Sequence, residues 1–275
     1  MTKRPARSLL FLTFVFSFSI LAAAQSKVAS YSLPQAISLE RIVRKTFPDY
    51  YGREEYHKLE VDGFFPIGWS RDGKFAYYVE PVDEACGCYF VELLIQDLRT
   101  DTILWKFKND PESRVDKDGA PLEDDIRRLW KRNQKLFDAK LNEYGIVPMA
   151  HFSLLPRSFS SAGKTYTAKI NAAKSNDEDG LNRVKTVSLD FRSPTLGKKT
   201  LYSADYRGDM FTSPLDVAVA GAFKSPYENR AAIIIINVQR GWEGPPHTVD
   251  VKIVGADLKN GFDKIHTQIP AARSR

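Results

Sequence analysis

Short apolar runs separated by polar turns dominate the chain from residue 63 onwards. The run GFFPIGWS is followed by the turn RDGK (71–74) and then by KFAYYVE. An Asp-Gly turn between two aromatic-rich runs predicts a β-hairpin, because glycine takes the positive φ that tight turns require. Further strands are predicted at 89–98, 102–107, 164–172, 184–192, 199–204, 215–223, 230–238 and 247–256. The acidic turn at 177–179 is interpreted as a hairpin tip.

Two segments have the apolar spacing of helices. A short helix is expected within residues 37–47, where Pro48 stops it. The clearer helix runs from Pro121 to about Tyr144, because proline suits the first helical position and Gly145 ends the apolar stripe. This stripe should pack on a sheet.

Two parts of the chain, residues 70–98 and 225–258, are similar to each other. Each has a serine, a polar turn ending in a basic residue (Lys74 or Arg230), a strand, a loop, a second strand and a closing Asp-Leu. The aromatic residues just upstream are Trp69 and Phe223. The offset drifts only from 155 to 160 residues. Two related β units, or shared turn and strand composition alone, account for this similarity.

About nine strands and one long helix predict a mainly β fold, a β-rich α+β protein. The paired segments favour a propeller-like or pseudo-symmetric assembly of antiparallel sheets, with one long inserted helix at about 121–144. We expect residues 57–275 to form a single β-rich domain, preceded by a lead-in segment at 25–56 and a signal peptide at 1–24.

The first 24 residues have the features of a secretory signal peptide. Three basic residues precede an uncharged, mostly apolar run from Leu9 to Leu21, and small residues follow up to a predicted cleavage between Ala24 and Gln25. The run of 13 residues is shorter than the roughly 20 that a bilayer span needs. No cysteine stands at the cleavage point, which argues against a lipoprotein. We therefore expect a periplasmic or secreted protein whose mature chain has no membrane span.

Charge changes the picture little. The full chain has 40 Lys and Arg against 34 Asp and Glu, and the predicted cleavage removes three basic side chains and no acidic ones. There is no long basic run, so we expect no binding to nucleic acid. With 43% hydrophobic residues, the chain can bury a sizeable core.

No sequence motif provides recognisable catalytic chemistry. GWSRD at 68–72 differs from the GxSxG nucleophile elbow, because Asp72 replaces the second glycine and a hairpin follows instead of a helix. Residues 114–125 imitate a calcium loop, but Arg114 takes the first ligand position and Pro121 interrupts the loop. We interpret that segment as a solvated loop before a helix.

Metal and cofactor sites are equally unsupported by the sequence. The histidines at 57, 151, 247 and 266 stand singly, so a structural zinc site would need the two cysteines plus distant histidines. No glycine-rich phosphate loop or dinucleotide motif is present. We expect no cofactor and no metal.

Both cysteines lie in the sequence VDEACGC, as Cys86 and Cys88. In an extended strand they would stand about 6.6 Å apart, near the upper limit for a disulfide, and a turn at Gly87 would bring them closer. Export to an oxidising compartment predicts a Cys86–Cys88 disulfide that stiffens the loop. A redox role is the alternative.

The sequence RGWEGPPH at 240–247 places Trp242 between Arg240 and Glu243 in a loop stiffened by prolines. Two interpretations are open: Trp242 is a partly exposed binding anchor, or it is a lid over the end of a β-sheet core. The usual burial of tryptophan favours the lid.

Two resemblances follow from these segments. GWSRDGKFAYYVE resembles the WSPDGK-type turn of TolB-like β-propeller repeats. The later segment resembles the C-terminal signature, SPYExR followed by GxEGP, of a family of predicted secreted bacterial proteins of unknown function. The matching residues are Ser225, Pro226, Tyr227, Glu228, Arg230, Gly241, Glu243, Gly244 and Pro245. The second resemblance covers about 80 mature residues; it implies export and no known activity.

These observations favour an exported, soluble, non-enzymatic protein that binds an envelope protein or another ligand through loops between strands. The alternative is an envelope hydrolase whose active site is dispersed along the chain, because side chains from distant loops would escape a search for motifs.

Overall fold

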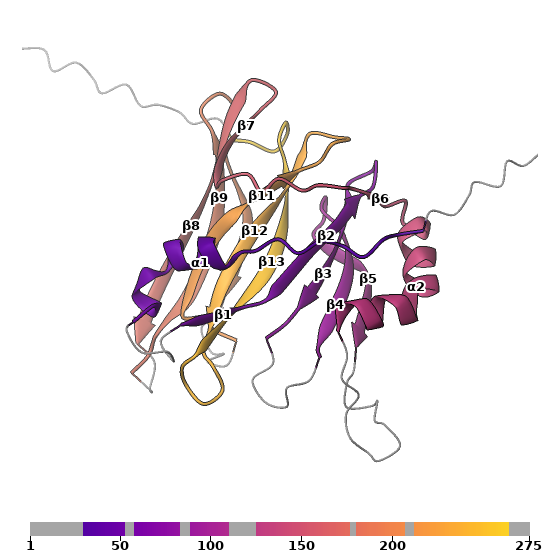
Figure 1. Ribbon diagram of the computed structural model, residues 1–275. Coiled ribbons are helices and arrows are strands. Elements are labelled where there is room, and N and C mark those ends of the chain that lie inside the picture. Colours follow the sequence, from indigo (N-terminus) through magenta and orange to yellow (C-terminus); the bar gives the residue numbers. More distant parts are fainter. Residues whose placement is uncertain are drawn as a thin grey trace, which may run out of the picture.

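The computed structural model describes residues 30–52, 58–82, 89–109, 125–176, 180–206 and 212–263 (Figure 1). This part of the chain is mainly β, as the apolar pattern predicts. Its helices are α1 (Glu40–Thr46) and α2 (Ile126–Glu143), with a short 3-10 helix, η1, at Pro48–Tyr50. Its strands are β1 (Leu59–Val61), β2 (Gly63–Trp69), β3 (Lys74–Glu80), β4 (Val91–Asp97), β5 (Thr102–Asn109), β6 (Val147–Pro148), β7 (Ser158–Ser161), β8 (Lys164–Asn176), β9 (Asn182–Ser193), β10 (Gly197–Asp205), β11 (Asp216–Lys224), β12 (Arg230–Gln239) and β13 (His247–Asp257). None of these helices has the length and apolar character needed to cross a membrane.

The strands form three sheets, and no propeller is present among the described residues. Sheet I has the order β5-β4-β3-β2-β6, sheet II the order β1-β13-β12-β11, and sheet III the order β10-β9-β8-β7. Neighbouring strands are antiparallel, except that β1 runs parallel to β13. Propeller blades are arranged radially around a channel, whereas here the sheets share apolar cores as successive layers.

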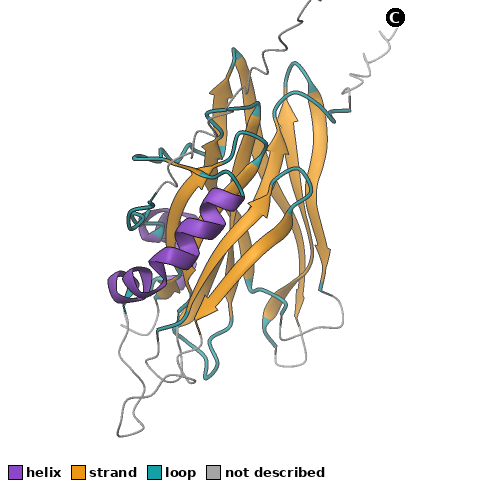
Figure 2. Ribbon diagram, turned by 90° about the vertical axis from the view of Figure 1, so that its right-hand side faces the viewer, coloured by secondary structure: helices purple, strands orange, loops and turns teal. Residues whose placement is uncertain are grey.

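Figure 2 shows the long helix lying against the strands. Three apolar cores hold the layers together. The first joins α2 to sheet I, as the apolar stripe of the helix predicts; the Trp130 ring lies 6.3 Å from that of Tyr78. The second joins sheets I and II, where Phe64 stacks on Phe223 at 6.1 Å. The third joins sheets II and III. Sheets I and II are therefore covered on both faces, with α2 and sheet III on opposite sides of the molecule (Figure 1).

The isoleucine run of β12 shows how the sequence provides a strand that is buried on both faces. Ile234 and Ile236 pack in the core between sheets I and II, whereas Ile233 and Ile235 pack in the core between sheets II and III. Successive side chains of a strand point to opposite faces, so a strand buried on both faces must be apolar at every position. A continuous run replaces the alternating pattern for this reason.

The lead-in segment also belongs to the core. Helix α1 places Val43 against the core between sheets I and II, and Phe47 directly follows the helix in the same cluster. The predicted short helix is present, and η1 begins at Pro48, where the helix was expected to stop.

Helix α2 begins later than predicted. Asp125 has an extended backbone, and its side chain accepts a hydrogen bond from the Arg128 N–H at 2.8 Å. It is therefore the N-cap, and the helix starts at Ile126 and not at Pro121. The sequence Asp-Ile-Arg-Arg contains a better helix-start signal than the earlier proline, because the carboxylate satisfies a backbone N–H that the helix leaves unpaired.

The two similar segments are called here the first unit (residues 70–98) and the second unit (residues 225–258). Each begins with a tight turn after a strand, β2 or β11, and contains two strands that continue the same antiparallel order. The closing leucines make the same contact: Leu98 N–H donates to the Gly73 carbonyl at 3.0 Å, and Leu258 N–H donates to the Asn229 carbonyl at 2.8 Å.

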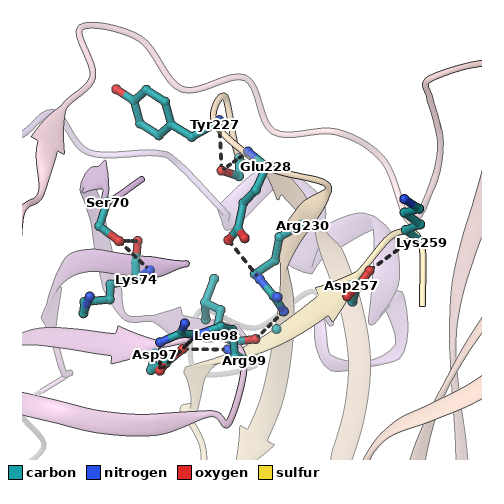
Figure 3. Close-up of polar contacts among 12 residues, drawn as sticks. Ser70, Lys74, Asp97, Leu98, Arg99, Tyr227, Glu228, Arg230, Asp257 and Lys259 are labelled. Carbon is teal, nitrogen blue, oxygen red and sulfur yellow. Dashed lines mark hydrogen bonds and ion pairs between the residues drawn. The ribbon is translucent and has the colours of Figure 1, made fainter. Parts of the chain in front are cut away.

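The aspartates before these leucines also have matching roles (Figure 3). Asp97 accepts a hydrogen bond from the Arg99 N–H at 2.9 Å, and Asp257 accepts one from the Lys259 N–H at 2.7 Å. The pairing register differs from the sequence alignment at one point. Trp69 pairs with Phe75 and Lys224 pairs with Ala231, so the counterpart of Trp69 is Lys224 and not Phe223.

The segment after α2 lies along the strands that precede both units. Gly68 of β2 pairs with Pro148 of β6, and Leu155 forms a two-way backbone bridge with Ala222 of β11 at 2.9 Å. A Cβ atom on Gly68 would overlap the Val147 carbonyl oxygen. Because only glycine leaves room for this close approach, this residue determines where the crossing segment lies.

Candidate functional site

The loop between β12 and β13 presents the most exposed large apolar side chain of the described residues. Trp242 is 83% exposed, so it does not cover the end of a sheet, and the lid interpretation is wrong. Two hydrogen bonds shape the loop: Gly241 N–H donates to His247 Nδ1 at 3.2 Å, and Gly244 N–H donates to the Gly241 carbonyl at 3.1 Å. The arrangement presents an aromatic surface on a braced loop.

The base of this loop rests against the lead-in segment. The His247 ring lies 6.0 Å from the Tyr50 ring, edge to face. The Tyr50 hydroxyl donates to Asp216 at 3.4 Å, and Asp216 forms an ion pair with Lys174 at 2.7 Å. Burial, reinforced by the Asp216 carboxylate, raises the pKa of Tyr50, so this tyrosine stays a neutral donor at physiological pH. Side chains from α1–η1, β8, β11 and β13 thus surround one end of sheet II.

The signature residues at 225–230 lie at the other end of β12 (Figure 3). The Ser225 hydroxyl accepts hydrogen bonds from the N–H groups of Tyr227 and Glu228, at 3.2 and 3.4 Å. Arg230 pairs with Glu228 at 3.0 Å and donates from Nη1 to the Leu98 carbonyl, also at 3.0 Å. Ser225, Glu228 and Arg230 therefore hold a turn and join it to the first unit.

The remaining signature residues divide between the two ends. Pro226 is exposed, and Tyr227 is 37% exposed with the Arg71 guanidinium 5.5 Å above its ring. Gly241 and Gly244 shape the Trp242 loop, and Gly244 has a φ of 111° that favours glycine. Pro245 lies in the same loop, as do Arg240 and Glu243. The two parts of the signature, residues 225–230 and 241–245, therefore lie at opposite ends of β12 and do not form one site.

The described residues contain no metal site, since no group of three or more His, Cys, Asp or Glu side chains among them is arranged to bind an ion. Ser70 of GWSRD is buried and accepts a hydrogen bond from the Lys74 N–H at 2.7 Å, as a turn serine does. Asp125, at the end of the calcium-like segment, caps α2. The other residues of that segment, the cleavage point at Ala24 and Gln25, and both cysteines, Cys86 and Cys88, lie outside the described residues.

Beyond the end of β1, the edge of β13 is covered by side chains of Gln96 in β4, Asp101 in the turn between β4 and β5, and Asp62 between β1 and β2. The backbone of Val251 donates to Asp62, Gly255 N–H donates to Asp101 at 2.7 Å, and the Ile253 carbonyl accepts from Gln96 at 3.1 Å. Burial raises the pKa of Asp62 to about 7, although its hydrogen bond from the Val82 N–H opposes the shift. These carboxylates are occupied in joining two sheets, and so they are not a free acid-base pair.

A groove on β2 is the cavity that the sequence did not predict. It measures about 400 Å³, its floor is Pro66 and Ile67, and its walls are the segments 32–37 and 148–152. The Trp242 loop does not line it. The clue available in the sequence was weak: two apolar, proline-containing segments far apart in the chain meet there only because both lie along one strand.

Comparison with known proteins identifies no relative: no family model, no curated protein and no solved structure matches the chain. The fold and the loops therefore define a class of architecture, a mainly β protein of three layered sheets with a long helix on one face.

Proposed function

We propose that this protein is a non-enzymatic binding protein of the cell envelope and that its Trp242 loop contacts the partner. The exposure of Trp242 carries the proposal. Its side chain is 83% exposed, so a partner that covers it removes a large apolar area from water. The braced base of the loop limits the entropy lost on binding.

The chemistry of the partner is constrained by the neighbours of Trp242. Arg240 and Glu243 stand on either side of it in the sequence, and a polar rim around an aromatic centre is the usual composition of a protein–protein contact. We therefore propose an envelope protein as the partner. Export through the predicted signal peptide is part of this proposal, as is membership of the exported family that the signature resembles.

A hydrolase is less well supported. In the part of the chain that the structure describes, His151 is the one ionisable side chain lining the β2 groove, and Ser70 is occupied in its turn. The units at 70–98 and 225–258 are proposed to be a pseudo-symmetric pair that serves as a scaffold for the loops.

A pull-down from an envelope extract tests the Trp242 loop. The mature chain should recover the partner, and the Trp242→Ala variant should recover at least tenfold less of it. Such a reduction is expected for an anchor residue whose truncation costs roughly 2 kcal/mol or more of binding free energy. Tyr227→Ala, which removes a half-exposed aromatic ring at the opposite end of β12, is the matched control and should leave recovery unchanged. Equal recovery by the wild type and Trp242→Ala would remove this loop from the proposed function.

The Cys86–Cys88 disulfide remains a separate prediction. Thiol titration of the exported, denatured chain should find no free thiol before reduction and two after it. Two thiols in the unreduced sample would contradict the predicted pairing.

A further inference from the structure

The Trp242 loop is held in place through one residue at its base. Gly241 is buried, its N–H donates to His247 Nδ1 at 3.2 Å, and its carbonyl accepts from the Gly244 N–H at 3.1 Å. The second of these hydrogen bonds closes a four-residue turn in which Trp242 is the first central residue. The position of Trp242 therefore depends on Gly241, and the position of Gly241 depends on the His247 ring.

The hydrogen bond from Gly241 requires a neutral imidazole. A neutral histidine ring has one nitrogen that donates and one that accepts, whereas both nitrogens of a protonated ring donate. Nδ1 of His247 is the acceptor here, so the bond exists only while this nitrogen carries no proton. Protonation would leave two donors, Nδ1–H and the Gly241 N–H, opposite each other.

The burial of Gly241 makes this loss consequential. A buried backbone N–H without an acceptor is unfavourable, and water can replace the lost acceptor only if the backbone moves to admit it. A neutral His247 and a fixed loop are therefore linked, as are a protonated His247 and a loosened loop.

The elements around His247 carry charges of both signs. The Tyr50 ring contacts His247 at 6.0 Å and donates its hydroxyl proton to Asp216, which is paired with Lys174. The other charged or titratable side chains on or next to these elements are Asp49 of η1, Lys58 and Glu60 at β1, Asp62 after β1, Arg240 and Glu243 of the loop, and Asp250 of β13. Burial raises the pKa of Asp62 to about 7, so its titration must be separated from that of His247.

From these contacts we propose that protonation of His247 loosens the Trp242 loop, so that the loop binds its partner near neutral pH and releases it in acid. Histidine is the side chain that ordinarily changes its charge between about pH 5 and pH 8. A loosened loop loses more conformational entropy on binding, which weakens the complex. The release of the partner rests on the function proposed for Trp242, whereas the loosening of the loop does not.

Nitrogen-15 relaxation of the mature chain, labelled at its tryptophans, tests the loop without a partner. The Trp242 backbone signal is the one that Trp242→Phe removes. Its order parameter should be about 0.85 near pH 7.5 and below about 0.6 near pH 5.5. His247→Asn keeps an acceptor oxygen in the place of Nδ1 and does not titrate, so the order parameter should stay high at both pH values.

Two further variants complete this test. His247→Phe keeps a ring beside Tyr50 but has no acceptor, so the order parameter of Trp242 should be low at both pH values. His151→Asn replaces the other histidine of the described residues and is the matched control, which should keep the pH dependence of the wild type. If His247→Phe does not fold, the comparison of the wild type with His247→Asn still decides.

The pull-down from an envelope extract, repeated at both pH values, tests the release. The wild type should recover about fivefold less partner near pH 5.5, as expected when one hydrogen bond is lost, and His247→Asn should recover equal amounts. The inference is overturned if the order parameter of the wild type does not change with pH, or if it changes equally in His247→Asn, which would assign the effect to another group such as Asp62. It is also overturned if the loop loosens in acid and recovery by the wild type stays constant.

Failure of the proposed function has a different signature. Equal recovery by the wild type and Trp242→Ala near pH 7.5 contradicts the binding role of the loop, and the release of a partner then falls with it. The relaxation data decide the loosening of the loop in either case.

Discussion

The last strands of the two units, β4 in the first and β13 in the second, occupy the same place in similar arrangements and have different outer edges. The edge of β4 is covered by a full strand, β5. The edge of β13 is covered by three residues of β1, and beyond them by side chains of Asp62, Gln96 and Asp101. A strand edge exposes unpaired backbone groups that promote aggregation unless they are covered. One edge is thus covered by a full strand, and the other by a short strand followed by side chains.

Two corresponding residues on β4 and β13 also differ between the units. Ile95 of β4 packs in the core beneath α2. Its counterpart on β13 is Gly255, since each residue stands three positions before the closing leucine of its unit. A Cβ atom on Gly255 would overlap the Leu98 carbonyl oxygen. The second unit gives up a core side chain so that the end of the first unit can approach its backbone. The two units share turn chemistry, and their contacts with each other distinguish them.

The largest effect on stability is expected from a side chain at Gly255, where the backbone of Leu98 lies close. Gly255→Val should lower the free energy of unfolding by about 3 kcal/mol, because the overlapping atom is backbone and cannot move aside as a flexible side chain would. Ile95→Val at the corresponding position should cost only about 1 kcal/mol. Urea denaturation of the two variants measures both values. Similar losses in the two variants would contradict the asymmetry between the strands.

The carboxylate that covers the edge of β13 should make stability depend on pH. The pKa of Asp62 is about 7 in the folded chain, whereas an aspartate in an unfolded chain has a pKa of about 3.9. Between these values the folded state binds more protons, so the contribution of Asp62 to stability is lost as the pH rises from about 4 to about 7.

Asp62→Asn removes this titration. The difference in unfolding free energy between wild type and Asp62→Asn should therefore change between about pH 4 and pH 7 and stay constant above the folded-state pKa of about 7. Denaturant titrations at several pH values measure it. A difference that is the same at all of them would show that Asp62 does not hold the proton.

The basic residues that close the two turns should have unequal effects. Arg230 is mostly buried, pairs with Glu228 and donates to the Leu98 carbonyl across the units, so Arg230→Met should cost about 1.5 kcal/mol. Lys74 pairs with the exposed Asp72 in its own turn, so Lys74→Met should cost under about 0.5 kcal/mol. Thermal unfolding of both variants gives the comparison. If Lys74→Met were the more damaging, the contact between units would not be the important one.

The smallest effect on stability is expected at the loop between the strands of the second unit. Trp242→Ala should change the free energy of unfolding by less than about 0.5 kcal/mol, because the side chain is 83% exposed. The same denaturation measurement therefore shows whether a loss of binding in this variant reflects the loop itself. A loss above 1 kcal/mol would mean that Trp242 supports the fold.

Much of the strand pattern was predictable, because apolar runs and glycine turns act locally. The predicted strand at 230–238 is present as β12, extended by one residue, and the turn at Gly73 joins β2 to β3. The pattern missed β1, β6 and β7, which are short and depend on distant partners. It also placed the helix start at Pro121, where the N-cap Asp125 decides the boundary.

The candidate sites were less predictable than the strands. RGWEGPP indicated a stiff loop, but local sequence carries no information about whether a neighbouring sheet covers Trp242. The β2 groove required knowing that residues 32–37 and 148–152 lie along the same strand. Such contacts depend on the docking of whole layers, and they become visible only when the complete fold is known.

The pairing of β1 with β13 has a consequence for how the chain acquires its structure. Leu59 pairs with His247, a residue far from it along the chain. Sheet II therefore cannot be completed until β13 has emerged from the ribosome, and contacts of such long sequence separation form slowly. The pairing of β1 with β13 is therefore expected to be among the last steps in the folding of sheet II.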